Sequence, residues 1–180
     1  MNSVIECILK RRSIRKYEKQ QVEEEKLNQI LECAKYAPSG KNRQTWHFTV
    51  VQNKNLIDEM AEDFRIVSNG NSRMSSKEYH VFYEAPTVIV VSAQDKQEYA
   101  TADCASAVEN ILIAAESLGL GSCFICLAIK IFKPETMLEK YKEKLELPEG
   151  YTPIYCVSIG YPKEEGKVHP RKENIVNYIK

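Results

Sequence analysis

Arg11-Arg12-Ser13-Ile14-Arg15 is the stretch around which this chain is organised. It directly follows residues 3–10, whose apolar side chains recur at the spacing of one helical face. Each guanidinium is a planar fork of donors that keeps its charge, so several of them beside a hydroxyl suit a phosphate group. Cations at the end of a helix also complement its dipole, however, and a basic run is often only a solvated face. On composition alone both interpretations stay open.

The composition predicts a single folded domain. With 180 residues, of which 43% are hydrophobic and 28% charged, the chain can bury a sizeable core. Lys and Arg together number 25, as do Asp and Glu, so we expect no general attraction to nucleic acid or to an anionic membrane. No apolar run has the length of a transmembrane helix, and the first residues do not resemble a secretory signal. We therefore expect one domain over residues 1–180, located in the cytoplasm.

Hydrophobic periodicity predicts several helices and few strands, in an uneven order that is typical of the α+β class. The expected helices cover residues 3–10, 23–37, 55–67, 103–118 and 134–145, and the expected strands cover residues 46–51, 87–91 and 154–159. Helix 103–118 is the longest and is nearly all apolar, so it is central or lies between subunits. Gly119 stands where a left-handed residue would end it. The continuous apolar strand 87–91 is expected to be covered on both faces.

Two polar loops are candidates for binding. Residues 37–44 read Ala-Pro-Ser-Gly-Lys-Asn-Arg-Gln and lead directly into strand 46–51, which would fix their position. A surface loop without a function would look much the same. Residues 68–77 are expected to form a mobile loop over or beside a site.

The residue types do not predict a catalytic side chain. The six cysteines are expected to be reduced and mostly buried. Cys123 and Cys126 have the spacing of a redox or metal pair, but no second pair and no thioredoxin-type context accompany them, so core packing is favoured. The three histidines form no triad signature, and the sequence contains no Walker loop and no cluster of metal ligands. Two basic stretches and two polar loops without a nucleophile are typical of a protein whose cofactor carries the chemistry.

Four segments make the chain resemble the flavin-dependent nitroreductase family, a group of FMN oxidoreductases. They are residues 11–15 after the first helix, residues 37–46 before a strand, residues 118–123 after the long helix, and Ile159-Gly160-Tyr161-Pro162 followed by Pro170-Arg171-Lys172. Together they span nearly the whole chain in the family's order. The first two segments are the more specific ones.

The resemblance implies a central, mostly antiparallel sheet flanked by helices, and an obligate homodimer with the long helix at its interface. Two FMN molecules would bind at that interface. Hydride from NADH or NADPH would reach flavin N5 and then pass to a small-molecule acceptor, such as a nitroaromatic or a quinone, in a ping-pong cycle that needs no catalytic side chain and no metal. A cation near the flavin N1 and O2 would stabilise the charge of the reduced ring.

The resemblance also implies cofactor contacts from both ends and the middle of the chain. The expected contacts with the phosphate are Arg11, Ser13 and Arg171, with Arg12 and His169 nearby. The expected contacts from the partner subunit are Pro38, Ser39, Asn42 and Gln44. Arg15 is expected at the pyrimidine edge of the flavin, and the backbone at Cys126 and Leu127 is expected to donate a hydrogen bond to flavin N5. Phe124 and residues 68–77 would shape the slot above the ring.

Other functions stay open at this point. A flavin-binding protein that stores the cofactor or binds a partner would carry the same residues, as would an enzyme of this fold with a different flavin reaction. Thiol–disulfide chemistry at Cys123 and Cys126 is a further alternative. Nucleic-acid binding is not expected, because the basic residues are balanced by acidic ones and lack interleaved aromatic residues.

Overall fold

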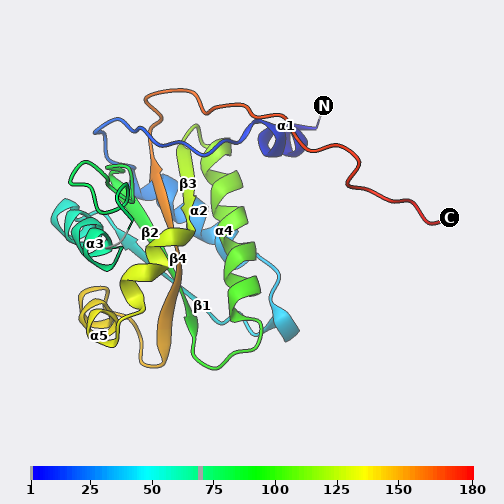
Figure 1. Cartoon of the computed structure of the whole chain (residues 1–180). Coiled ribbons are helices and arrows are strands. Elements are labelled where there is room, and N and C mark those ends of the chain that lie inside the picture. The colour runs from blue at the N-terminus through cyan, green and yellow to red at the C-terminus, as the bar shows by residue number, and fades with distance from the viewer. Residues whose placement is uncertain (1, 69–70) are drawn as a thin grey trace.

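The computed structural model describes residues 2–68 and 71–180, and its centre is a four-stranded sheet (Figure 1). The strands are β1 (Trp46–Val51), β2 (Thr87–Gln94), β3 (Gly121–Ile125) and β4 (Tyr151–Gly160). Their order in the sheet is β1-β2-β4-β3, and each neighbouring pair is antiparallel. The predicted α+β class with an antiparallel sheet is therefore confirmed.

Helices cover both faces of this sheet. They are α1 (Ser3–Lys10), α2 (Glu24–Lys35), α3 (Lys54–Val67), α4 (Ala100–Ser117) and α5 (Glu135–Lys144), with 3₁₀ turns at Gly40–Asn42 and Cys126–Phe132. Side chains of α2 and α4 form one buried cluster with the sheet, and side chains of α3, α5 and the second 3₁₀ turn form another. Figure 1 shows α4 on one side of the sheet and α3 and α5 on the other.

The residues of β2 alternate between these two clusters. Val88 and Val90 pack with α3 and α5, whereas Ile89 and Val91 pack with α2 and α4. All four side chains are fully buried, and burial of such a side chain contributes about 1.5–3 kcal/mol. The prediction that this strand is covered on both faces is confirmed.

Residues 11–17 cross the end of the sheet in an extended conformation, from Ser122 at the start of β3 to Pro162 after the end of β4. Ser13 pairs with Ser122 in a parallel bridge, and the Ile14 N–H donates to the Ser122 carbonyl oxygen at 2.9 Å. Successive side chains of an extended segment point to opposite sides. Ile14 accordingly turns inward and is buried, while Ser13 and Arg15 remain more exposed.

β3 is the main element that the sequence did not predict. Its pairing with β4, rather than the propensity of its five residues, makes it a strand. β3 also divides the C-x-x-C pair, because Cys123 is buried in the sheet and Cys126 is exposed in the turn that follows. Core packing is thus right for Cys123 and wrong for Cys126. Cys33 is also exposed and Cys7 is half-buried, so only half of the six thiols are buried as expected.

The other expected elements are present with small differences in length. α4 begins at Ala100, three residues earlier than expected, and β4 begins at Tyr151 rather than at Ile154. Pro153 is tolerated inside β4 because it lies where the register with β2 shifts. Gly119 has a φ angle of +73° and ends α4 as predicted.

Both ends of the chain carry exposed apolar side chains. On α1 these side chains are between 46% and 58% exposed, and they are Val4, Ile5, Ile8 and Leu9. The C-terminal tail runs away from the body (Figure 1), and its apolar side chains, between 62% and 99% exposed, are Ile175, Val176, Tyr178 and Ile179. Exposed apolar groups of this extent are typical of interaction surfaces.

Two further expectations concern membrane spans and the loop after α3. Among residues 2–68 and 71–180, no helix combines the length and the apolar character needed to cross a membrane. The expected loop over residues 68–77 includes residues 69 and 70, which lie outside the described residues, as does residue 1. From Asn71 onward this segment forms turns, in which the Asn71 Oδ1 accepts from the Met74 N–H at 3.2 Å.

Candidate functional site

Three side chains of the extended N-terminal segment gather beside Cys123 of β3. They are Arg11, Ser13 and Arg15, and we call them the basic edge. Burial raises the pKa of the Cys123 thiol, whereas Arg11, Ser13 and Arg15 each lower it. Because such an effect acts over a short distance, all three side chains lie close to the thiol. Because they occupy alternate positions of an extended segment, their side chains share one side of it.

The basic edge keeps hydrogen-bonding capacity for an anion. The Arg11 Nε lies 3.8 Å from a carboxylate oxygen of Glu109, which is a loose ion pair. The Arg15 Nη1 donates to the Ser13 carbonyl oxygen at 3.5 Å, at the limit of a hydrogen bond. A guanidinium has five N–H donors. Both arginines therefore have donors left for an anionic ligand, which is compatible with the expected places of Arg11 at the phosphate of the cofactor and Arg15 at the edge of its ring.

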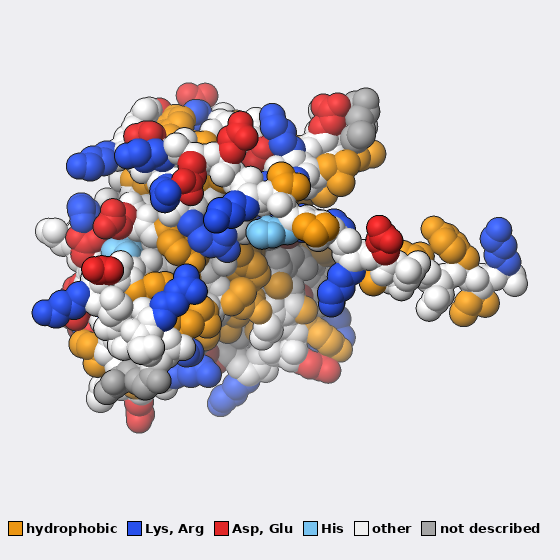
Figure 2. Space-filling view, turned by 45° about the horizontal axis from the view of Figure 1, so that its top comes forward, with side chains coloured by type: hydrophobic (Ala, Val, Ile, Leu, Met, Phe, Trp, Pro, Cys, Tyr) orange, Lys and Arg blue, Asp and Glu red, His pale blue; other side chains and the backbone are white. Residues whose placement is uncertain are grey.

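The face of the molecule along which the N-terminal segment runs combines charge with apolar area. Figure 2 turns the top of Figure 1, along which the N-terminal segment runs, toward the viewer. Lys and Arg side chains border a patch of hydrophobic side chains near the middle of this view, and the tail projects beyond it. A ligand that joins a phosphate to an apolar ring would match both parts of such a surface.

The side chain of Arg12 lies on the other side of the same segment. Its Nη1 donates to the carbonyl oxygens of Leu9, at 2.6 Å, and Arg11, at 2.7 Å. The chain passes directly over it at Gly166, where an added Cβ would lie 2.1 Å from the Arg12 Cβ. Arg12 also lines a separate cavity of about 540 Å³. The structure therefore does not bring Arg12 together with Arg11 and Arg15.

Residues 38–44, which we call the polar loop, are held in shape by their own side chains. The Ser39 Oγ accepts from the Gln44 N–H at 3.0 Å, and the Gln44 Nε2 donates to the Asn42 Oδ1 at 3.1 Å. Lys41, Asn42 and Gln44 have φ angles of 56°, 54° and 51°, a left-handed region that Asn tolerates but that is unfavourable for Lys and Gln. Strained backbone of this kind is concentrated at functional sites.

Asp103 fastens the polar loop to the first turn of α4. Its Oδ1 accepts from the Gly40 N–H at 2.9 Å, and the residue is only 5% exposed. A Cβ at Gly40 would lie 2.5 Å from the Tyr99 ring, so glycine is needed for this close approach. Pro38, at the start of the loop, is exposed.

Within one chain the polar loop and the basic edge lie at opposite ends of α4 (Figure 1). The loop is bound at Asp103, whereas the basic edge lies against β3, which follows the end of α4 at Ser117. From position 103 to position 117 is 14 residues, and at about 1.5 Å per residue they span about 21 Å. A single chain therefore does not bring all the predicted contacts together.

Cys126 and Leu127 begin the 3₁₀ turn after β3, and both are exposed. Cys126 lies near enough to Cys123 to raise the pKa of that thiol, which places the turn close to the basic edge. The first N–H groups of a helical turn have no partner within the turn, so the backbone here can donate to a ligand. Phe124 packs its ring edge-on against Tyr155 at 4.8 Å between centroids, on the face of the sheet that α2 and α4 cover, so its expected place at the slot above the ring stays a prediction.

His169 and Arg171 lie in the exposed C-terminal segment. Within the described part of the chain, no hydrogen bond or ion pair joins either of them to Arg11 or Ser13. The structure of one chain thus leaves the expected contribution of the tail to the phosphate site as a prediction.

Two residues near the site were not singled out from the sequence. Tyr83 faces Arg15, with the Arg15 Cζ 5.7 Å from the centroid of the Tyr83 ring. Asp103 is buried beneath the polar loop. An acid in the first turn of a helix is ordinarily a partner of the helix dipole, and an aromatic residue before a strand is ordinarily core, so neither position gave a distinct signal.

Comparison with known proteins identifies a family and several similar structures. The model of the nitroreductase family matches residues 8–161. A solved nitroreductase with bound FMN from Bacteroides fragilis is 34% identical, with a TM-score of 0.92 and complete coverage (100%) of both chains. A nitroreductase with bound FMN from Desulfitobacterium hafniense is 30% identical, with a TM-score of 0.93 and the same 100% coverage. An FMN reductase (NADPH) of Bacillus subtilis is 27% identical over 95% of this chain and 70% of its own length.

Proposed function

The chain belongs to the nitroreductase family, and on this premise we propose that it is an oxidoreductase that uses FMN to pass electrons from NADH or NADPH to a small-molecule acceptor. The observation that carries the proposal is the basic edge, where two arginines with spare donors flank a hydroxyl beside the exposed turn at Cys126. Nitroaromatic compounds and quinones are the acceptor classes we expect. We propose that the whole chain forms one domain that works in the cytoplasm.

The basic edge would hold the phosphate of FMN. Arg11 and Ser13 supply charged and neutral donors on one side of the segment, and hydrogen bonds to an ionised group are roughly twice as strong as neutral ones. Arg171, with His169 beside it, would join them when the tail is seated in the assembled protein. Arg12 would act indirectly, because its guanidinium fixes the path of the segment from the other side.

Arg15 and the turn at Cys126 and Leu127 would serve the ring of the cofactor. FMN, when bound, supplies the chemistry of hydride transfer at N5 of its ring. Arg15 would place a permanent positive charge at the pyrimidine edge, where negative charge develops. The backbone at Cys126 and Leu127 would orient the ring by donating to N5. No side chain needs to move a proton, and an open slot over the ring would let donor and acceptor bind in turn, as in a ping-pong cycle.

We also propose that the functional unit is a homodimer built on α4. A two-fold axis across this helix would place the polar loop of one subunit beside the basic edge of the other, at both ends. Pro38, Ser39, Asn42 and Gln44 would then contact the cofactor from the partner. Small side chains on the uncovered side of α4, such as Ala102 and Ala105, permit close approach of a second helix. The exposed apolar side chains of α1 and of the tail would be covered in the same assembly.

The test is an absorbance spectrum of the purified protein followed by anaerobic titration with each nicotinamide. We expect a flavin spectrum, rapid bleaching by NADH or NADPH, and recovery of colour when a quinone or a nitroaromatic compound is added. Stable flavin that no nicotinamide reduces would indicate a storage protein. A colourless protein that takes up no added FMN would contradict the proposal altogether. Loss of turnover on replacing Cys123 and Cys126 by Ser, with flavin content unchanged, would point to thiol chemistry instead.

A further inference from the structure

Tyr83 lies opposite Arg15 in the turn that leads into β2. The Arg15 Cζ is 5.7 Å from the centroid of the Tyr83 ring, within the range of an attractive cation–π contact. Tyr83 is half-buried, and it packs against a small cluster of buried side chains formed by Ile14, Tyr17 and Ala85. Its ring is therefore supported from behind while it faces the guanidinium.

The backbone of this turn is strained. Tyr83 and Glu84 have φ angles of 56° and 54°. Two consecutive residues in the left-handed region are unusual, and a bulky aromatic residue there is a genuine outlier. Such a conformation persists only where the surrounding structure fixes it.

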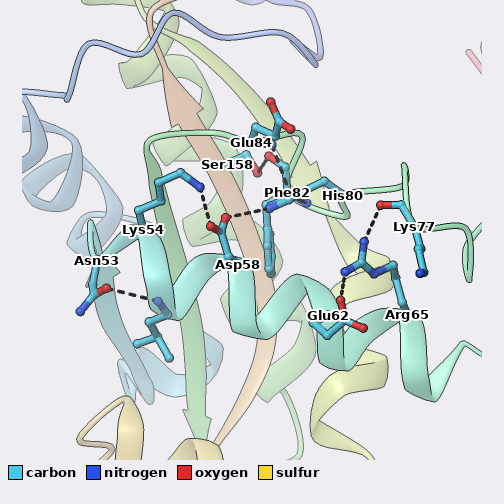
Figure 3. A network of polar contacts seen from close by, with 11 residues as sticks. Asn53, Lys54, Asp58, Glu62, Arg65, Lys77, His80, Phe82, Glu84 and Ser158 are labelled. Carbon is cyan, nitrogen blue, oxygen red and sulfur yellow. Dashed lines mark hydrogen bonds and ion pairs between the residues drawn. The ribbon is translucent and has the colours of Figure 1, made fainter.

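His80 holds much of the backbone of this turn in place (Figure 3). Its Nδ1 accepts from the backbone N–H groups of Phe82, at 3.2 Å, and Glu84, at 3.3 Å. Its Nε2 lies 3.4 Å from the Asp58 Oδ1 on α3, so the ring is oriented from both ends. The Ser158 Oγ of β4 donates to the Phe82 carbonyl oxygen at 3.1 Å. The turn is thus bound to α3 and to the central sheet, and the direction of the Tyr83 side chain is fixed.

Arg15, by contrast, is weakly held. It is exposed, the hydrogen bond to the Ser13 carbonyl oxygen measures 3.5 Å, and a further polar group close to its guanidinium is the Tyr83 hydroxyl, which raises the Arg15 pKa. A long, mobile side chain loses rotamer entropy when a ligand immobilises it. An aromatic face that restricts the guanidinium beforehand reduces that loss.

We propose that Tyr83 is a positioning residue whose ring, held by the strained turn, keeps the Arg15 guanidinium where the ring of the cofactor binds. This inference rests on the proposed function, because it assigns Arg15 to the FMN ring. It adds a residue that makes its contribution through Arg15 and not through contact with the reacting atoms.

The test separates the ring of Tyr83 from the strain of its backbone. Asn tolerates the left-handed region better than most residues, so Tyr83→Asn removes the ring while favouring the fold of the turn. We expect it to raise the Kd for FMN about threefold, the size expected for loss of a cation–π contact at a partly exposed site, and to slow flavin reduction by NADH or NADPH. Tyr83→Phe keeps the ring and removes only the hydroxyl, which also acts on Arg15, so FMN affinity and the rate of flavin reduction are expected to lie between those of Tyr83→Asn and the wild type.

A double-mutant cycle with Arg15→Met shows whether the effect passes through Arg15. In the Arg15→Met background, Tyr83→Asn is expected to cause no further loss of FMN affinity. As a matched control, Tyr161 also faces a cation, with the Lys26 Nζ 4.8 Å from its ring centroid, and Tyr161→Asn should leave FMN affinity unchanged. Additive losses in the double variant, or an unchanged Kd and reduction rate in Tyr83→Asn, would overturn the inference alone. A wild-type protein that takes up no FMN would overturn the proposed function with it.

Discussion

Arg11 and Arg12 are neighbours in the sequence, but their guanidinium groups lie on opposite sides of one extended segment. Arg11 faces Cys123 and Glu109, whereas Arg12 donates to the backbone of Leu9 and Arg11. The alternation that separates them was readable in principle, because Ile14 shares the side of Arg12 and is buried. Residue type alone could not separate them, since both are cations after a helix.

Arg11→Ala and Arg12→Ala should therefore have different consequences. Arg11→Ala removes a charge-assisted contact to phosphate, which is worth about 1.5–3 kcal/mol, so the Kd for FMN should rise at least about tenfold. Arg12→Ala should mainly lower the thermal stability of the FMN-free protein. Fluorescence titration with FMN and thermal unfolding measure the two effects. Equal losses of FMN affinity in both variants would contradict the division between the two sides.

His80 should make stability depend on pH. Burial holds the pKa of His80 below its ordinary value, and it outweighs the opposite effect of Asp58 and Glu84. The unfolded chain therefore binds a proton at a pH where the folded chain does not. Stability should fall as the pH falls below about 6.5, until the folded-state pKa is reached. Melting temperatures at pH 7 and pH 5 should differ more in the wild type than in His80→Gln, and equal differences would exclude this role.

At the scale of elements, the polar loop depends on α4. Asp103→Ala leaves the Gly40 N–H without its acceptor, so the strained loop should loosen and the Kd for FMN should rise about tenfold. Asp95, whose Oδ1 accepts from the Thr152 hydroxyl at 2.7 Å, offers a matched control outside the loop. Asp95→Ala should leave the Kd unchanged. An unaffected Kd in Asp103→Ala would mean that the loop does not need this anchor.

Most elements of the fold were predictable because their residues repeat with a clear period. The helices and three of the strands appear within a few residues of their expected positions. β3 was not predictable, because only its pairing with β4 makes it a strand. The turn that holds Tyr83 is also invisible in the sequence, since its shape depends on His80 and Ser158 from different parts of the chain. The residues of the basic edge and the polar loop stood out in the sequence as candidates, but their separation along α4 required the structure.

At the scale of the whole molecule, subunit mixing tests whether two chains share each site. In a heterodimer of Arg11→Ala and Asn42→Ala subunits, one site would combine both changes and the other would be entirely wild type. Mixing two weakly binding variants should therefore restore about one tight FMN site per dimer. FMN content after denaturation and co-refolding of the two variants gives the answer. If mixing restores no tight binding, each site is formed within a single chain.

The length of α4 constrains how this protein can vary. The helix carries the anchor of the polar loop in its first turn and leads into the strand beside the basic edge. One inserted residue would rotate these two points by about a quarter turn relative to each other, since a full turn takes 3.6 residues. In a symmetric dimer, this misplacement of the polar loop relative to the basic edge would affect both active sites. Over evolution, insertions and deletions should therefore collect in the segments before β2 and after β4, while the span from Asp103 to Ser117 keeps a constant length.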